Sequence, residues 1–498
     1  MKKSKTVIAA LILALVIAVH TTAIAQPSDN LPQRIENGIV YIPLRLTAYS
    51  HGAAVEWNAD TRTVYITDAG GSRQSVAVEA AGGFIEDGVS WIPYEYAARL
   101  FGTPVVQDHA EATDAEQLIA SIIDVIDGIE AARLFAEEHS KVLDITSTDG
   151  YVFQGRLTMP AGDEKIPAIV IDTGTSGPHT YLMGIYVPGI GRFNYWDFWA
   201  KEYANNGVAF FTANTRGVTP SDEPPAFMDI DEEGYLTYLP SNVVEDVYHM
   251  IRAVRENPRL ADAKIFLNGH SEGAIIASLF EATHPGIADV LLLAGIPVTG
   301  MADIVRWQAS GGATMMVLAE FFEVDEYGRI SREAFYAGPW ETMMGASFEE
   351  LDLDRDGFFD VRDLLAVWEL MGVPPHMYDA DVVFDAVARG DDEWLRENYP
   401  VLLTAGWFQE HFDLRSNMEM LTELDLPIYI FHGTLDANVY VGHVRELEDR
   451  LREMGRTNVV INIFLGHGHD LNFGLEVFLG EISDGIQAIF DAVIARII

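Results

Sequence analysis

The sequence contains no cysteine, and lysine is scarce beyond its first few residues. The absence of cysteine excludes disulfides, thiolate metal sites and cysteine nucleophiles. Basic residues number 32 against 75 acidic residues, so the formal net charge is 32 − 75 = −43. Such an acidic excess repels phosphate groups, and we expect no nucleic-acid partner. Uncharged runs long enough to cross a bilayer are also missing, so the sequence predicts no stable membrane insertion.

The first 25 residues have the pattern of an export signal. Lys2, Lys3 and Lys5 form a basic start, an apolar run follows over Val7–Val19, and Ala23–Ala25 supplies small residues for cleavage. This pattern predicts a signal peptide over 1–25 and a protein that is secreted, extracellular or associated with the cell envelope. The alternative is an uncleaved anchor, although the run is shorter than the roughly 20 residues of a membrane span.

The next segment is an internal duplication. Residues 38–55 and 88–105 align without a gap at an offset of 50, and each copy predicts a strand, a proline-started helix and a second strand. The motif VYIPLR followed by GAAVEWNADTRTVYI resembles the copper amine oxidase N-terminal-like domain over residues 31–107. The resemblance implies a small α+β module for envelope attachment or spacing. Copper is not implied, because His51 and His109 are too few for a metal cluster.

The remainder of the chain predicts a connector helix over 108–141 and a large α/β domain over 142–498. Short, nearly continuous apolar runs alternate with helical patterns, which indicates a mostly parallel sheet with helices on both faces. These runs are Ala168–Asp172, Val208–Ala213, Lys264–Asn268, Val290–Ala294, Ile428–His432 and Val459–Phe464.

A candidate nucleophile lies at the end of the third of these strands. Gly269-His270-Ser271-Glu272-Gly273 separates a strand from a helix, and the two glycines allow a sharp turn that lifts Ser271 above the sheet. A serine hydroxyl needs a base and a group that orients the base. Asp436 follows the strand that ends at Phe431, and His469 follows the next strand.

The order serine, acid, histidine and the motif Gly466-His467-Gly468-His469 resemble the α/β-hydrolase superfamily, in its esterase and dienelactone-hydrolase-like branches. The resemblance implies a triad of Ser271, Asp436 and His469, with His467 as the alternative base. An oxyanion hole needs two N–H donors. We expect one from Glu272 and the other from Thr175 or Ser176, in the turn after Asp172.

The stretch between the strands at 290–294 and 428–432 is too long for an ordinary connection and predicts an inserted helical cap over about 297–425. Within it, oxygen ligands at positions 1, 3, 5, 7, 9 and 12 and a glycine at 6 fit a structural calcium loop. Aspartate at position 12 resembles dockerin-type loops, and the alternative is an acidic turn. The predicted ligands are Asp352, Asp354, Asp356, the carbonyl of Phe358, Asp360 and Asp363.

The sequence therefore predicts a secreted serine hydrolase that cleaves small-molecule carboxylic esters through an acyl-enzyme on Ser271, with no cofactor for catalysis. A serine peptidase of the same fold is one alternative, because the same triad cleaves amides. A catalytically inert calcium-binding envelope protein is the other.

Overall fold

The computed structural model describes the larger domain almost continuously. It also describes seven short strands between residues 34 and 93, whereas the predicted signal peptide lies outside the described residues. In the described part of the chain, no helix has both the length and the apolar character to cross a membrane. From residue 128 onward, the described residues are 128–182, 184–187, 191–223, 227–309, 329–337, 347–371, 379–399, 401–473 and 482–497.

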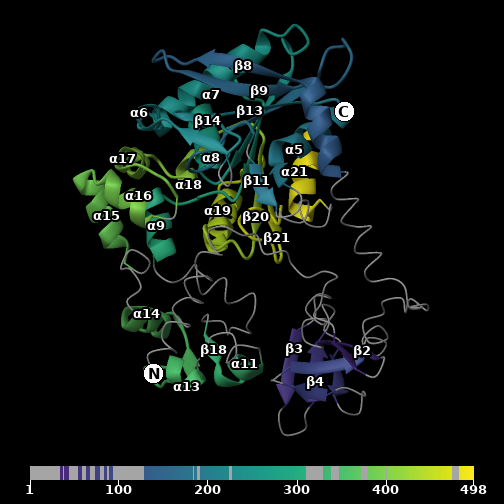
Figure 1. Ribbon diagram of the computed structural model, residues 1–498, viewed down its shortest axis with the longest axis vertical. Coiled ribbons are helices and arrows are strands. Elements are labelled where there is room, and N and C mark those ends of the chain that lie inside the picture. Colours follow the sequence, from purple (N-terminus) through teal and green to yellow (C-terminus); the bar gives the residue numbers. More distant parts are fainter. Residues whose placement is uncertain are drawn as a thin grey trace. The chain divides into compact units, whose positions relative to one another are not determined.

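An eight-stranded sheet forms the centre of the larger domain (Figure 1). Its strand order is β21-β20-β17-β16-β10-β13-β9-β8, and the pairs from β13 to β21 are parallel. Antiparallel pairing joins β9 to β8 and to β13. This mostly parallel order, with helices between the strands, is the α/β-hydrolase fold. The strands are β8 (Ser140–Thr146), β9 (Val152–Thr158), β10 (Ala168–Asp172), β13 (Ala209–Ala213), β16 (Lys264–His270), β17 (Val290–Ala294), β20 (Ile428–Gly433) and β21 (Val459–Phe464).

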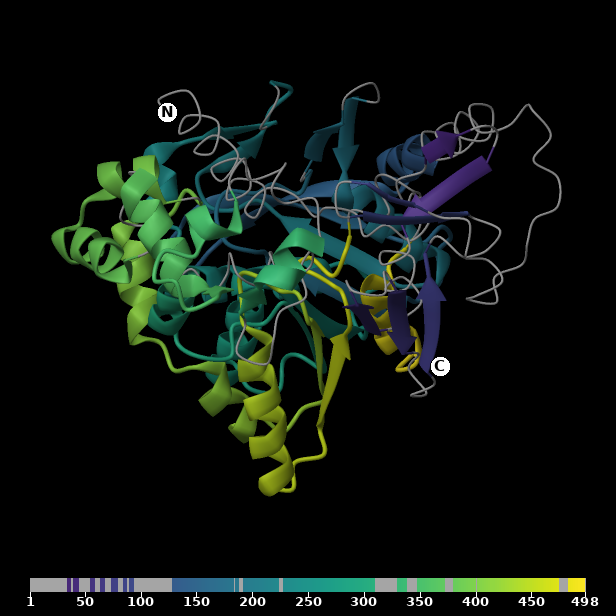
Figure 2. The same ribbon diagram turned by 90° about the horizontal axis from the view of Figure 1, so that it is seen from below.

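Both faces of the sheet are covered, as the continuous apolar runs predict. Alternate residues of one strand, such as Ile169 and Val170, belong to two different hydrophobic cores. One core contains α7 (Pro240–Arg255), α8 (Glu272–Thr283) and α19 (Val441–Glu453), and the other contains α5 (Tyr195–Asn205) and α21 (Asp484–Ile494). Figure 2 shows α19 and α21 on opposite sides of the carboxy-terminal strands. The carboxyl ends of the parallel strands remain available for a site.

The long insertion between β17 and β20 divides into two parts. Its helices α9 (Met301–Ala309), α15 (Ala380–Arg389), α16 (Asp392–Asn398) and α17 (Ala405–Asp413) share a hydrophobic core with Tyr235, Tyr238 and Ile275 of the sheet domain. Residues 318–372 instead group apart from the unit that holds the sheet. The predicted cap over 297–425 therefore contains segments of both compact units.

The amino-terminal module contains a two-fold arrangement of its duplicated strands. The hairpin β1 (Arg34–Glu36) and β2 (Ile39–Pro43) corresponds to the hairpin β6 (Phe84–Glu86) and β7 (Val89–Pro93), and the sheet order is β1-β2-β7-β6. β2 pairs antiparallel with β7, and Ile42 lies opposite its own repeat partner Ile92. Between the two copies, β3 (Ala54–Asn58) and β4 (Thr63–Thr67) form an antiparallel hairpin, with β5 (Arg73–Ala77) paired to β4.

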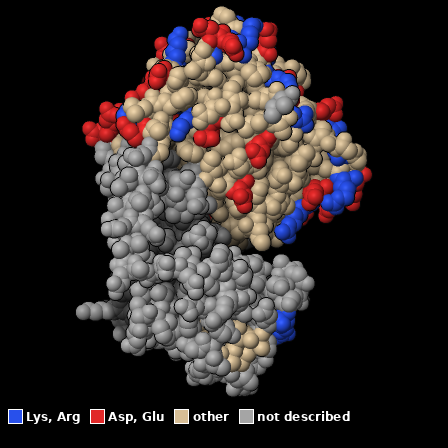
Figure 3. Space-filling view, turned by 90° about the vertical axis from the view of Figure 1, so that its right-hand side faces the viewer, with Lys and Arg blue, Asp and Glu red and all other residues tan. Residues whose placement is uncertain are grey.

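The predicted connector is helical over residues 128–139, immediately before β8. Its Arg133 bonds to Glu130 at 2.6 Å and also to Glu137, one turn away on each side. Basic and acidic side chains are also neighbours elsewhere on the protein. Figure 3 shows that Lys and Arg (blue) lie close to Asp and Glu (red) along the margins of the described surface. The scarce cations are therefore placed beside acids, which lowers the self-repulsion of the acidic chain.

Candidate active site

Ser271 occupies a strained turn at the carboxyl end of β16. Its φ of 56° and ψ of −116° are unusual for a residue with a side chain, and it forms the N-cap of α8. The flanking glycines make this turn possible, because a Cβ at Gly269 would lie 2.1 Å from the carbonyl oxygen of Gly273. The N–H of Ser271 donates to the carbonyl of Ala294 at 2.9 Å. This bond fixes the turn against the end of β17.

Asp436 and His469 meet at the same edge of the sheet. The Nδ1 atom of His469 lies 2.8 Å from Oδ2 of Asp436, whose other oxygen accepts the N–H groups of Asn438 and Val439 at 2.9 and 2.8 Å. Asp436 is fully buried, and its three bonds hold the carboxylate in one orientation. The ring of His469 packs against Gly295, where a Cβ would lie 3.0 Å from the ring. Gly295 follows Ala294, the partner of Ser271.

The electrostatics of this pair favour an ionised acid beside a basic histidine. Burial opposes ionisation of Asp436, but His469 and His432 lower its pKa below the ordinary value. Burial likewise lowers the pKa of His469, whereas the carboxylate of Asp436 outweighs this effect and raises that pKa above 6.5. A proton on Nδ1 that is donated to Asp436 leaves Nε2 as the acceptor.

The alternative base, His467, has a different environment. Its Nδ1 lies 3.1 Å from the carbonyl of Leu465, two residues earlier in the same loop. Its backbone packs against Gly433, where a Cβ would lie 2.0 Å from the carbonyl oxygen of His467. Of the two histidines considered from the sequence, the structure therefore brings His469 to Asp436, and the ring of His467 lies beside the carbonyl of Leu465 instead.

The two elements expected to supply oxyanion donors are in contact. A Cβ at Gly273 would lie 2.0 Å from the carbonyl oxygen of Gly174, and the hydroxyl of Thr173 donates to the carbonyl of Gly273 at 2.8 Å. Thr175 and Ser176 follow in this turn, and both are half-buried. The turn after β10 and the start of α8 are thus packed directly against each other.

The side chain of Glu272 is the centre of a buried network that the sequence did not predict. Its carboxylate accepts the indole N–H of Trp407 at 2.7 Å and lies 2.9 Å from Nε2 of His411. The hydroxyl of Tyr238 lies 2.5 Å from the second oxygen and 3.2 Å from the carbonyl of Thr175. Burial, and then the charge of Glu272, raise the pKa of Tyr238, so it stays protonated and can donate. The network ties α17 to the residue after Ser271.

His270 forms a second connection that the sequence did not predict. Its Nε2 lies 2.9 Å from the carbonyl of His469, and its Nδ1 lies 3.4 Å from the hydroxyl of Thr175. Burial is the main reason that the pKa of His270 falls to about 4, so the ring is neutral near pH 7. A neutral ring that donates from Nε2 to the carbonyl accepts at Nδ1 from Thr175. His270 therefore links the loop of His469 to the turn after β10.

The predicted calcium loop brings three of its carboxylates together. Oxygen atoms of Asp352, Asp354 and Asp356 all lie within 4.8 Å of one another. Gly357 has a φ of 89°, which matches the sharp turn expected at position 6. Oδ1 of Asp352 is buried without a hydrogen-bond partner among the described residues. These features fit a hard cation that is held by carboxylate oxygens.

The later predicted ligands have other partners. Asp363 accepts the backbone N–H groups of Leu353 and Asp360 at 2.7 and 3.3 Å, and Asp360 pairs with Arg362 at 2.7 Å. Phe358 lies in β19 (Phe358–Phe359), which pairs with β18 (Ile330–Ser331). The last residues of the loop begin α14 (Val361–Met371).

The strand order and the strained serine turn together define the class of this domain as the α/β-hydrolase fold. At the amino terminus, the family described as the copper amine oxidase N-terminal domain matches residues 23–113, which include the predicted module over 31–107. A search of proteins with curated functions finds no match.

Solved structures with a similar fold include Est1E from Butyrivibrio proteoclasticus, with 13% identity, a TM-score of 0.37, and coverage of 72% of this chain and 98% of that one. A thermostable carboxyl esterase from Bacillus coagulans has 17% identity, a TM-score of 0.40 and coverage of 72% and 99%. A dipeptidyl aminopeptidase IV homologue from Bacteroides ovatus has 13% identity, a TM-score of 0.38 and coverage of 71% and 35%. At these values the class rests on the strand order, and the activity has to be argued from the site.

Proposed function

We propose that the protein is a serine hydrolase that cleaves carboxylic esters through an acyl-enzyme on Ser271. The observation that carries this proposal is the 2.8 Å contact between His469 and Asp436, at the sheet edge where Ser271 forms its strained turn. A hydroxyl on a sharp turn, a base and a buried acid that orients the base are the parts that nucleophilic catalysis requires.

The proposed reaction has two similar halves. His469 takes the proton of Ser271 at Nε2 while the hydroxyl oxygen attacks the ester carbonyl, and Asp436 stabilises the resulting imidazolium. The tetrahedral oxyanion accepts hydrogen bonds from the backbone N–H of Glu272 and from that of Thr175 or Ser176. The proton then passes to the departing alcohol, which leaves an acyl group on Ser271. A water molecule activated by His469 releases the acid in the same way.

The hydrogen bonds of the Glu272 carboxylate favour an ester substrate over a peptide with a free amino terminus. A carboxylate that recognises a substrate ammonium group must have an oxygen available to it. Both oxygens of Glu272 already have partners in Trp407, His411 and Tyr238, and the residue is 1% exposed. We therefore expect short acyl esters to have a much higher kcat/KM than aminoacyl amides, and the opposite preference would favour the peptidase alternative.

A fluorophosphonate probe tests the proposal directly. The probe should label the folded wild-type protein at Ser271, and Ser271→Ala should remove both the label and the ester hydrolysis. His469→Ala should lower kcat by several orders of magnitude, whereas His467→Ala should lower it less than about tenfold. Folded protein that takes up no label would favour the catalytically inert alternative.

We also propose export and a structural calcium ion, which rest on separate observations. The basic and apolar pattern of residues 1–25 supports secretion, and the module matched over 23–113 supports attachment to the cell envelope. Asp352, Asp354 and Asp356 support calcium, because clustered carboxylates with an unpartnered buried oxygen suit a hard cation. The mass of the mature protein tests the cleavage after Ala25.

A further inference from the structure

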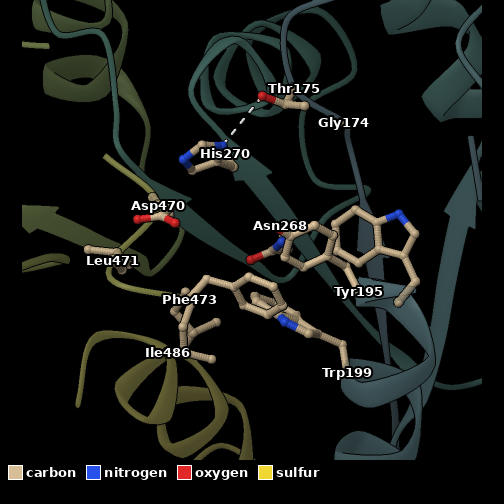
Figure 4. Close-up of a pocket in the computed structure, with 13 residues that line it drawn as sticks. Gly174, Thr175, Tyr195, Trp199, Asn268, His270, Asp470, Leu471, Phe473 and Ile486 are labelled. Atoms are coloured by element: carbon tan, nitrogen blue, oxygen red, sulfur yellow. Dashed lines mark hydrogen bonds between the residues drawn. The ribbon is translucent and has the colours of Figure 1, made fainter. Parts of the chain in front are cut away.

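A pocket beside the candidate active site lies on the side of the sheet covered by α5 and α21 (Figure 4). Its lining includes Thr175, His270 and Asp470. Two of these residues directly adjoin the proposed catalytic residues, because His270 precedes Ser271 and Asp470 follows His469. Two lining residues are therefore next in sequence to the proposed nucleophile and the proposed base, and the pocket lies on the opposite side of the sheet from α8.

The walls of the pocket are mainly aromatic. Tyr195, Trp196 and Trp199 come from α5, and Phe473 comes from the loop after His469. The rings of Tyr195 and Phe473 are in contact, with their centroids 3.9 Å apart. Figure 4 shows Trp199, Phe473 and Ile486 grouped on the side away from His270 and Thr175. Flat apolar walls of this kind favour a flat apolar occupant.

The volume of the pocket limits the size of that occupant. The cavity measures about 150 Å³. An apolar cavity of about 150 Å³ in another protein is known to bind benzene. A long acyl chain would need more room, whereas a methyl group would leave most of the space empty. The size therefore matches one six-membered ring.

The charges around the pocket select against ionised occupants. The lining, as far as the described residues form it, includes no lysine or arginine. His270 is neutral near pH 7, because burial lowers its pKa to about 4. Asp470 also lines the pocket, and in its ionised form it would repel a carboxylate. Because burial of any charge against the mainly apolar walls is unfavourable, an uncharged ring is the occupant that the lining favours.

We propose that this pocket, between the carboxyl end of β16, α5 and α21, binds an uncharged aromatic ring of the ester substrate while the ester group lies at Ser271. The inference rests on the proposed hydrolase function and adds a substrate class to it. The ring can belong to the acyl or to the alcohol part of the ester. Two isomeric esters distinguish these cases, because methyl phenylacetate carries the ring on the acyl side and benzyl acetate carries it on the alcohol side.

The experiment compares kcat/KM for these two isomers and for ethyl acetate. Ile486 lines the pocket and is almost fully buried, so Ile486→Phe fills it, and Ile486→Val is the matched control. Ile486→Phe should lower kcat/KM at least tenfold for one of the two isomers and less than twofold for ethyl acetate. Ile486→Val should change all three values less than threefold. An equal effect of Ile486→Phe on ethyl acetate and on both isomers would overturn the pocket assignment.

A measurement on the wild-type protein covers the case in which Ile486→Phe does not fold. Benzyl alcohol and 1-heptanol have the same number of carbon atoms, and heptanol is the more hydrophobic. Benzyl alcohol should inhibit ethyl acetate hydrolysis competitively at a concentration at least fivefold lower than heptanol, because the pocket selects a ring. Stronger inhibition by heptanol would overturn the inference. Absence of ester hydrolysis together with absence of Ser271 labelling would instead overturn the proposed function.

Discussion

The indole N–H of Trp407 donates a 2.7 Å hydrogen bond to the carboxylate of Glu272, although the two residues are 135 positions apart in the chain. Both side chains are almost fully buried. Glu272 also carries the backbone N–H that we expect to stabilise the oxyanion. The bond therefore joins helix α17 of the insertion to a proposed catalytic group.

Loss of this bond should reduce both stability and turnover. Trp407→Phe keeps most of the ring but removes the donor to a buried carboxylate, which costs about 1.5–3 kcal/mol in the free energy of unfolding. We expect kcat to fall several-fold with little change in the KM for ethyl acetate. Trp394→Phe is the control, because Trp394 packs in the same core from α16 without a bond to Glu272. Equal effects of the two substitutions on kcat would remove the special role of Trp407.

The bridge made by His270 leads to a second prediction. His270→Ala removes the contacts to the carbonyl of His469 and to the hydroxyl of Thr175, and kcat should fall about tenfold or more. His270→Gln can still donate from an amide near the position of Nε2 and should recover part of that loss. The rate of fluorophosphonate labelling at Ser271 should follow the same order. Equal labelling rates for the alanine and glutamine variants would show that the bridge does not position the base.

The pH dependence should report the environment of His469. Only the neutral imidazole accepts the proton of Ser271, so kcat/KM should fall as the pH drops through the raised pKa of His469, above 6.5. Asp436→Asn removes the charge that raises this pKa and leaves the burial that lowers it. The acid limb should then move to lower pH while the plateau falls by about 10³–10⁴. If the acid limb of the pH profile does not move in Asp436→Asn, the limb reports the titration of a group other than His469.

Removal of metal tests the calcium loop. Calcium that binds the native state alone stabilises it by mass action, about 2.7 kcal/mol at a hundredfold excess over Kd. A chelator should therefore lower the melting temperature, and added calcium should restore it. Asp352→Asn should weaken this response, whereas Asp381→Asn, in the exposed first turn of α15, serves as the control. An identical melting curve with and without chelator contradicts a bound calcium ion.

The inner strands of the central sheet could be predicted from the sequence because they are buried on both faces. A buried parallel strand is a continuous apolar run, and Ala168–Asp172 and Val290–Ala294 have the same limits in the sequence pattern and in the structure. The edge strand Val459–Phe464 also has the predicted limits, although it is only half-buried. The candidate site residues were also predictable, since each follows a strand end within a few positions. The position of each residue relative to the end of a predicted strand is therefore enough to select it as a candidate.

The network around Glu272 could not be predicted in the same way. Glycines and a strand-to-helix change identify Ser271, but nothing near Glu272 in the sequence indicates His411, 139 residues later, as its partner. The aromatic pocket is similar, because its walls come from α5, α21 and a loop that are far apart in the chain. Contacts of this kind depend on how the helices pack on the sheet, and the residue order of a single sequence does not indicate that packing.

The pairing of Ile42 with Ile92 has a consequence for how the amino-terminal module is made. Strand β2 leaves the ribosome before β7 has been synthesised, and in that interval one edge of its hairpin has no neighbour. The missing neighbour is a near copy of β2 itself, so the β2 strand of a second nascent chain offers much the same partner. Because of the duplication, β2 finds a pairing strand within the same polypeptide. A single repeat could pair in this way only with another molecule. The short spacing between the repeats favours closure within the chain over exchange between chains.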